Sequence, residues 1–184
     1  MILPIVEYGH PALRSKGRLI ERIDERIVKL AQNMIDTMND ANGVGLAAQQ
    51  VGLPLQICVI DVLDASAPGT MTVDGREVPL EDYMPLVLIN PEVEPIGEIE
   101  TDTEGCLSFP GLLGGIPRPN SVRVKARTLE DEVLEFTATG LLARAVQHEH
   151  DHLHGILFID RMIESDLQEI SSAVESLRRR NAVV

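Results

Sequence analysis

The sequence predicts an α+β fold in which antiparallel sheets pack around a central helix, the one that carries His148-Glu149-His150-Asp151-His152, with a further helix near the C-terminal end. Three observations lead to this class. Short β-branched runs are bounded by turn residues, three stretches have helical periodicity, and strands and helices do not alternate as they would in a parallel sheet. A length of 184 residues fits one domain, residues 1–184.

The first helix is expected from about Asp24 to Asp40. Its apolar residues recur mostly at spacings of three and four and form one stripe, made of Ile23, Ile27, Leu30, Ala31, Met34, Ile35 and Met38. Asn42-Gly43 should end this helix, because Asn and Gly favour turns.

Two short apolar runs, Gln56–Asp61 and Leu86–Asn90, are predicted as strands, and the proline after the second run should end it. Between them Asp74-Gly75 predicts a small hairpin. We expect this connection, residues 63–83, to be an excursion on the surface.

The second half of the chain adds two strands and two helices. Ser121–Thr128 alternates apolar and basic residues, and Val133–Ala138 is its expected antiparallel neighbour. The central helix should span Leu141–Leu153. The last helix should run from about 165 to 180, begin with a capping box of Ser165 and Gln168, and bury one face. That face consists of Leu167, Ile170, Val174 and Leu177.

The net charge is strongly negative, 16 − 29 = −13. Such a charge repels phosphate backbones, so it argues against DNA as a partner and against nucleic-acid binding through a broad basic surface. Two cysteines make no disulfide framework. No apolar run approaches the roughly 18 residues of a membrane helix, and the first residues lack a signal-peptide pattern. We therefore expect a soluble, cytoplasmic protein without a membrane partner.

The strongest chemical signal is the HExxH pattern on the central helix. His148 and His152 are four residues apart, so their rings project from one helix face and can share a metal ion. Glu149, beside the first histidine, could accept a proton from a water molecule. HExxH also occurs by chance, and the alternative is a solvated helix end, since His150 and His154 lie off that face and should be on the surface.

A catalytic tetrahedral site needs three protein ligands and one open position. No further histidine follows in a spacing typical of a third ligand, which leaves Cys106 in Glu104-Gly105-Cys106-Leu107-Ser108-Phe109-Pro110-Gly111. The neighbouring Gly and Pro predict a turn that presents the thiolate. The alternative for a free cysteine is a small buried apolar residue. We prefer this alternative for Cys58, inside an apolar strand, and the ligand for Cys106.

Closely spaced glycines between Gly43 and Gly52 indicate backbone that approaches a ligand or another chain segment. Gln50 within this stretch could donate its amide to a developing oxyanion. A phosphate cradle is weakly supported because no Gly-Lys-Ser/Thr follows, and a tight turn that enters a strand is the simpler alternative.

Three ordered motifs, GVGLAAQQ, EGCLS and QHEHDHLHG, resemble the peptide deformylase family, and the likeness spans about Pro11 to Arg161. The resemblance implies an enzyme, a metal-dependent hydrolase that removes the N-terminal formyl group from formyl-methionyl nascent polypeptides and releases formate. It implies metal ligation by Cys106, His148 and His152. It implies a catalytic acid/base, Glu149, and oxyanion donors in the Gln50 amide and the Leu107 N–H. The substrate contacts that it implies are Val44, Gly45, Leu141 and Ala145.

One divalent metal per chain is implied. Two imidazoles and a thiolate suit Zn²⁺, while Ni²⁺ and Co²⁺ would also fit. The resemblance favours Fe²⁺ as the working ion. Two residues depart from the family pattern, Gln49 and Phe109, and Phe109 is expected at the rim of the cleft.

Several further expectations concern side-chain partners. Arg118 is predicted to pair with Glu104, Arg144 to point its charge outward, and His152 to have its second ring nitrogen held by a carboxylate or carbonyl. Arg178-Arg179-Arg180 could touch ribosomal RNA transiently. Two rival functions stay open, an HExxH endopeptidase and a non-catalytic binding module, although the second would be expected to lack Glu149 or Gln50.

Overall fold

The computed structural model describes residues 1–182. Three helices are present in this range: α1 (Glu25–Asp40), α2 (Gly140–Leu153) and α3 (Glu164–Asn181). Seven strands form one sheet: β1 (Gly45–Ala47), β2 (Ile57–Ile60), β3 (Met71–Val73), β4 (Arg76–Val78), β5 (Leu86–Gly105), β6 (Leu113–Arg127) and β7 (Val133–Thr139). The 3-10 turns are η1 (Pro11–Arg14), η2 (Ala48–Val51), η3 (Leu80–Asp82) and η4 (Phe158–Asp160).

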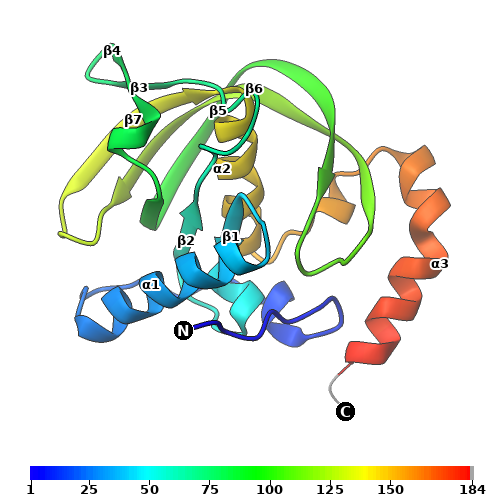
Figure 1. The fold of residues 1–184 in the computed structure, drawn as a ribbon. Coiled ribbons are helices and arrows are strands. Elements are labelled where there is room, and N and C mark those ends of the chain that lie inside the picture. Colours follow the sequence, from blue (N-terminus) through cyan, green and yellow to red (C-terminus); the bar gives the residue numbers. More distant parts are fainter. Residues whose placement is uncertain (183–184) are drawn as a thin grey trace.

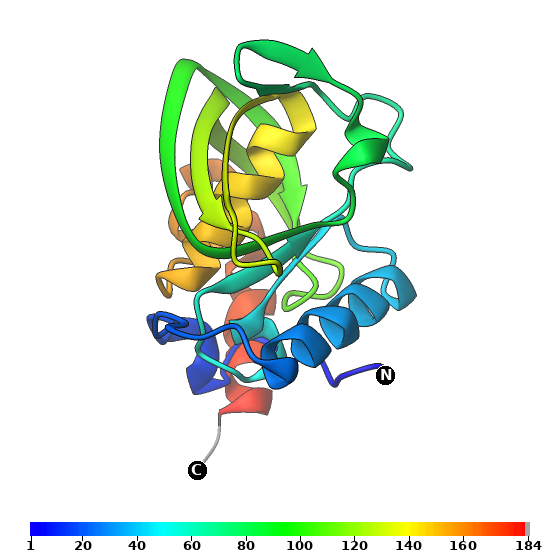
Figure 2. The same ribbon diagram turned by 90° about the vertical axis from the view of Figure 1, so that its left-hand side faces the viewer.

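The sheet has the order β1-β2-β5-β6-β7-β3-β4, and every neighbouring pair is antiparallel. It curves around α2, which lies inside the concave face, while α1 and α3 lie outside this enclosure (Figures 1 and 2). The predicted α+β class, antiparallel strands around the HExxH helix plus a C-terminal helix, is confirmed. Among the helices of residues 1–182, none has the length and apolar character needed to cross a bilayer.

Helix α1 begins where the sequence predicts. The Asp24 carboxylate accepts hydrogen bonds from the backbone N–H groups of Arg26 and Ile27, which satisfies two donors at the first turn. Its apolar stripe buries Met34 and Met38 against β1 and β2. Because β1 follows α1 directly, this packing fixes the start of the Gly-rich segment.

Strand β5 does not stop before Pro91 as predicted but continues to Gly105. Asn90 adopts a left-handed conformation with φ 51°, and the register with β6 shifts between Ile89 and Glu92, so Pro91 lies within a bulge. Beyond residue 90 the strand pairs only with β6, and prolines are tolerated on strands with an open edge. We call the two-stranded segment formed by residues 92–105 and 113–120 the arm; its first strand carries Glu104 and ends at Gly105.

The predicted hairpin at Asp74-Gly75 is confirmed by β3 and β4, with φ values of 49° and 74° at its two turn residues. The segment around it is not only a surface excursion. Strand β3 pairs with β7, and the side chains of Met71 and Leu80 are buried in the core around α2. The expectation for residues 63–83 was therefore incomplete, because Met71 and Leu80 serve the core.

Helix α2 is buried on most of its circumference, since it packs against both walls of the curved sheet. Its apolar residues Leu142, Ala143, Val146 and Leu153 contribute to the core cluster that contains β2, β6 and β7. Gly155 follows the helix with φ 72°, as predicted for a helix C-terminus. The buried position of α2 means that its polar residues must find partners inside the protein.

Helix α3 begins at Glu164, and the side chain of its N-cap residue, Ile163, makes no hydrogen bond to the first turn. The predicted capping box is wrong, because Ser165 lies inside the helix and its hydroxyl donates to Asp166. The apolar face is confirmed: Leu177 is buried, and Leu167, Ile170 and Val174 pack on the same cluster. The arm holds the start of α3, since the Gly115 N–H donates to Asp166 Oδ2 at 2.7 Å.

Candidate active site and metal centre

The three candidate metal ligands converge. Cys106 directly follows β5 at the end of the arm, while His148 and His152 lie one turn apart on α2. One donor atom from each residue lies within 4.8 Å of the other two. Cys106 Sγ is 3.3 Å from His152 Nε2, and the two imidazole centroids are 5.0 Å apart. The structure therefore has a possible metal site at Cys106, His148 and His152.

A thiolate and two imidazoles form a donor set that fits a tetrahedral divalent ion and leaves one coordination position open. The turn after β5 presents the sulfur, because the Phe109 N–H donates to the Cys106 carbonyl at 2.9 Å. His148 Nδ1 is 2.9 Å from Glu104 Oε2, so with a proton on Nδ1 the Nε2 lone pair faces the cysteine. The prediction of a fixed second nitrogen is wrong for His152, whose buried Nδ1 has no partner in residues 1–182.

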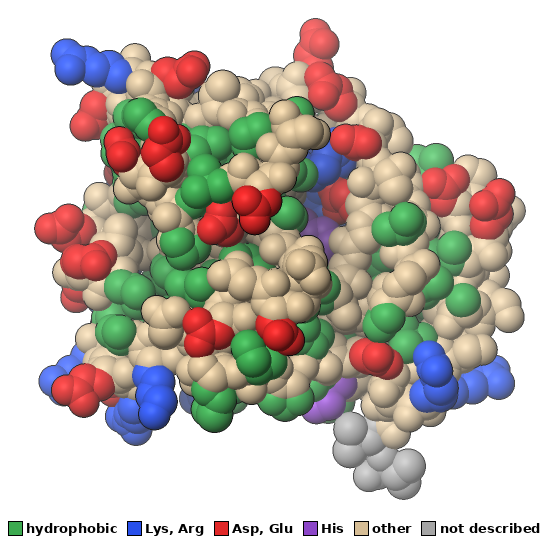
Figure 3. All heavy atoms as spheres, in the orientation of Figure 1, with side chains coloured by type: hydrophobic (Ala, Val, Ile, Leu, Met, Phe, Trp, Pro, Cys, Tyr) green, Lys and Arg blue, Asp and Glu red, His purple; other side chains and the backbone are tan. Residues whose placement is uncertain are grey.

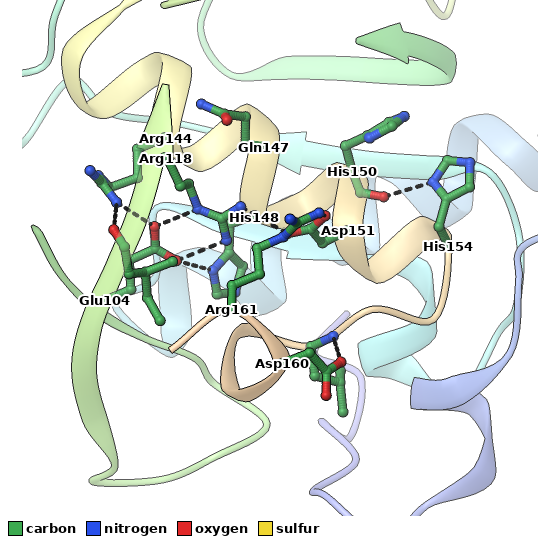
Figure 4. Close-up of polar contacts among 12 residues, drawn as sticks. Glu104, Arg118, Arg144, Gln147, His148, His150, Asp151, His154, Asp160 and Arg161 are labelled. Carbon is green, nitrogen blue, oxygen red and sulfur yellow. Dashed lines mark hydrogen bonds and ion pairs between the residues drawn. The ribbon is translucent and has the colours of Figure 1, made fainter. Parts of the chain in front are cut away.

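Glu104 is the centre of a buried polar network (Figure 4). Its carboxylate accepts from Arg118 Nε at 2.7 Å and Arg118 Nη2 at 3.1 Å, which confirms the predicted pair. Burial alone would raise the pKa of Glu104, but the hydrogen bonds from His148 and Arg118 outweigh burial and lower the pKa to about 2. Glu104 is therefore a fixed negative charge behind His148.

The network extends along α2 and out to the arm. Arg118 Nη1 donates to Asp151 Oδ2 at 2.8 Å, and Asp151 also accepts two hydrogen bonds from Arg161, each 2.6 Å long. The prediction for Arg144 was wrong: its guanidinium is turned inward, 2.9 Å from Glu104 Oε1, and also donates to the Ile116 carbonyl at 2.8 Å. The buried negative charge of Glu104 attracts the Arg144 guanidinium and holds it away from solvent.

Glu149 projects toward the Gly-rich segment. Its carboxylate packs directly against Gly45, where an added Cβ would overlap Glu149 Oε1. Its Oε2 is buried and has no hydrogen-bond partner within residues 1–182, and burial raises the pKa of Glu149 to about 7. A carboxyl group with such a pKa can accept and return a proton near neutral pH.

Two further donors are directed at the same region. Gln50 is buried, its Oε1 accepts from the Ala47 N–H at 2.9 Å, and its Nε2 lies 3.5 Å from Cys106 Sγ. The accepted bond fixes the amide so that its NH₂ group faces the cysteine. The Leu107 N–H makes no hydrogen bond inside the described part of the chain, so it is available to a ligand.

A cleft of about 500 Å³ opens beside these groups. The four predicted substrate contacts all line it, and they are Val44, Gly45, Leu141 and Ala145. Gln50, Cys106, His148 and Glu149 line its floor, and Figure 3 shows histidine, basic and acidic atoms inside a hollow near the middle of this face. Phe109 contributes to the lining but is 1% exposed and stacks on Tyr8 at 4.8 Å, so it belongs to the core more than to the rim.

The remaining candidates lie away from the cleft. Cys58 is buried in β2, and burial raises the pKa of its thiol, as expected for an apolar core residue. His150 and His154 are not among the three converging donors; they are half-buried and face each other instead. Sequence reasoning missed the contacts of Glu104 with His148 and Arg144, because no spacing signal links residues of the arm to residues of α2.

Comparison with known proteins gives one consistent result. The family model described as Polypeptide deformylase matches residues 2–168. A peptide deformylase of Methylacidiphilum infernorum is 44% identical over 184 residues, which are 100% of this chain and 97% of that protein.

Solved structures agree. The crystal structure of peptide deformylase from Thermus thermophilus has a TM-score of 0.80 at 34% identity and covers 98% of this chain and 99% of its own. A peptide deformylase from Synechococcus elongatus in complex with actinonin has a TM-score of 0.80 at 35% identity, with 94% and 86% of the two chains covered. The chain therefore belongs to the peptide deformylase family, the metalloenzymes that remove the N-terminal formyl group from nascent formyl-methionyl polypeptides.

Proposed function

We propose that Cys106, His148 and His152 hold one catalytic divalent ion and that Glu149 moves the proton of the deformylation reaction. The observation that supports this assignment is the convergence of the three donor atoms within 4.8 Å of one another beside the cleft that Glu149 lines. When bound there, a divalent ion would lower the pKa of a water molecule toward neutrality and polarise the formyl carbonyl group.

The residues of the chain then carry out hydrolysis of the formyl amide. Glu149 accepts a proton from water as the water oxygen forms a bond to the formyl carbon. The bond between this carbon and the amine nitrogen breaks, and Glu149 returns the proton to the departing nitrogen. The products are formate and a free amino terminus. The second proton of the water stays on the product as formic acid, which ionises to formate and gives that proton to solvent or to the freed amine. The pKa of about 7 suits Glu149 to both transfers.

Negative charge develops on the formyl oxygen during the attack. The Gln50 amide, oriented by the Ala47 N–H, and the N–H of Leu107 would donate hydrogen bonds to this oxygen, and both residues line the cleft. One such donor typically lowers the barrier by about 3 kcal/mol. Because Gln50 is already hydrogen-bonded in the correct direction, it does not need to reorganise as the charge forms.

The apolar lining of the cleft supports methionine as the first residue of the substrate. Leu141 and Ala145 project from the first turns of α2, and Val44 comes from the segment that precedes β1. These side chains offer an unbranched thioether an apolar surface next to the formyl position. Gly45 leaves the substrate backbone room to approach.

The variant Glu149→Gln tests the assignment. It keeps the size of the side chain but cannot accept a proton, so we expect metal content near one equivalent and formate release from formyl-Met-Ala-Ser that is lower by roughly 10²–10⁴-fold. Turnover like that of the wild type would reject the role of Glu149. Cys106→Ala should lose the metal instead. Cleavage of casein by the wild type would favour the endopeptidase alternative.

The identity of the metal needs direct measurement. We propose Fe²⁺ as the working ion on the basis of the family resemblance, with Zn²⁺, Ni²⁺ or Co²⁺ as ions that the same ligands accept. Metal analysis under anaerobic conditions, coupled to formate release, distinguishes them. Activity retained only by a zinc-loaded enzyme would contradict the choice of Fe²⁺.

Three broader proposals follow from the substrate. The whole chain, residues 1–184, would act as one catalytic domain in the cytoplasm, where formylated nascent chains are made. The third is a transient contact of Arg178, Arg179 and Arg180 with ribosomal RNA, in which RNA phosphates would compete with Glu175, the ion-pair partner of the first two at 2.9 and 2.8 Å. Replacing the three arginines by Gln and measuring co-sedimentation with ribosomes tests this contact; unchanged binding would reject it.

A further inference from the structure

A second pair of histidines lies at the C-terminal end of α2, with His150 in the last turn and His154 as the C-cap residue that follows it. His150 and His154 have the same spacing of four residues as His148 and His152, but they are displaced by two positions, which is about 200° around a helix. Their ring centroids are 4.4 Å apart with an interplanar angle of 49°. Figure 4 shows the two rings next to each other at the C-terminal end of the helix, away from Glu104 and His148.

The hydrogen bonds leave ring nitrogens of this pair available. His154 Nδ1 lies 2.9 Å from the His150 carbonyl, to which it donates when protonated, so Nε2 of the same ring keeps its lone pair. Within residues 1–182 the His150 ring makes no hydrogen bond. The neighbouring Asp151 does not compete for the pair, because its carboxylate is taken by Arg118 and Arg161.

Both rings are partly accessible to solvent outside the catalytic cleft. Both residues are half-buried, and His154 lines a hollow of about 570 Å³ that shares no lining residue with the cleft. A role in capping the helix explains only the Nδ1 atom of His154. It does not account for the position of the His150 ring beside that of His154, and the proposed deformylation chemistry uses neither residue.

We propose that His150 and His154 form a second divalent-metal site, separate from the catalytic centre, with one nitrogen of each ring as ligand and solvent in the other positions. Imidazole ligands select borderline ions such as Ni²⁺, Zn²⁺ and Cu²⁺ over Mg²⁺ and Ca²⁺, which prefer oxygen. Two protein ligands hold an ion less tightly than three, so this site fills after the catalytic one. The net charge of −13 favours the approach of a cation at long range, whereas Lys16, Lys125 and Arg127 in the lining of the hollow oppose it locally and keep binding weak.

Metal titration of the holoenzyme tests the proposal. Enzyme that carries one equivalent in the catalytic site is dialysed against Ni²⁺, and bound metal is measured against free Ni²⁺. We expect a second, weaker equivalent in the wild type, and its loss in both His150→Ala and His154→Ala. His10→Asn is the matched control, because His10 is the one histidine outside residues 148–154 and its Nδ1 caps η1, a position that Asn also suits.

Formate release by the one-equivalent enzyme checks that the variants are folded. It should be unchanged in His150→Ala and His154→Ala, and a variant that fails this check is replaced by the corresponding Gln. A wild type that takes up only one equivalent would overturn the proposal. So would retention of the second equivalent in either single variant, because a chelate needs both rings.

Discussion

Replacement of Arg118 by Met should strongly destabilise the fold. Arg118 is 2% exposed and donates three hydrogen bonds, two to Glu104 and one to Asp151. Breaking a buried ion pair by removal of one partner typically costs about 3–5 kcal/mol, because a buried charge is left uncompensated. Arg144 still binds Glu104 and Arg161 still binds Asp151, so we expect the lower end, about 3 kcal/mol.

A control on the same strand isolates the effect of burial. Arg123 also lies in β6 and pairs with Glu94, but the two side chains are 62% and 63% exposed. Exposed pairs contribute about 0–1 kcal/mol, so Arg123→Met should be nearly neutral. Since 1 kcal/mol shifts Tm by about 2–4 °C in a protein of this size, Arg118→Met should lose about 6–12 °C and the control at most a few degrees.

Urea unfolding followed by far-ultraviolet circular dichroism is the appropriate assay, because the chain has no Trp for fluorescence. It should be repeated with and without chelator, since an ion that binds only the folded state adds stability of its own. The folded-state pKa of Glu104, about 2, is below its ordinary value of 4.5, so its ionisation stabilises the fold above pH about 4.5, and this contribution disappears as pH falls toward 2. If both arginine variants unfold within 1 kcal/mol of each other, the buried network does not support the fold as argued.

Three further predictions concern the cleft. Gly45→Ala should lower the free energy of unfolding by about 1–3 kcal/mol and reduce formate release, because the added methyl group displaces the Glu149 carboxylate. Wild-type values in thermal unfolding and turnover would contradict this. Iodoacetamide should modify Cys106 only after metal removal. It should modify Cys58 only after unfolding, because Cys58 is buried and burial raises the pKa of its thiol. Equal labelling of the two cysteines in native protein, read by mass spectrometry, would exclude Cys106 as the metal ligand. Asp102 lies on the cleft wall, so peptides with Lys after the first residue should have up to about 5-fold higher kcat/KM than peptides with Glu, a preference that Asp102→Asn and added salt should reduce.

Local signals predicted most of the fold. The caps and periodicity of α1, the turn of β3 and β4, and the bounds of α2 are encoded by residues close to one another in sequence. The HExxH spacing likewise placed His148 and His152 together, since helix geometry alone brings them to one face.

The longer strands were not predictable in the same way. Pro91, Pro95, Pro117 and Pro119 all argue against strands when read locally, yet β5 and β6 contain every one of them. They are accommodated because the arm has open edges beyond the β2 and β7 pairings, and this depends on which strands are neighbours. The contact of Glu104 with His148 depends on the same tertiary arrangement, so no pattern in the sequence could reveal it.

The contact between the arm and α3 has a consequence for how this enzyme can vary. Gly114 and Gly115 make the arm thin where α3 starts, and a Cβ at Gly114 would be only 2.5 Å from the Met162 sulfur. The start of the C-terminal helix and the segment before it therefore pack on bare backbone of the arm, close to the strand that leads into Cys106. A relative with a bulkier residue at the position of Gly114 would have to place its C-terminal helix elsewhere or hold its cysteine loop in place by other means.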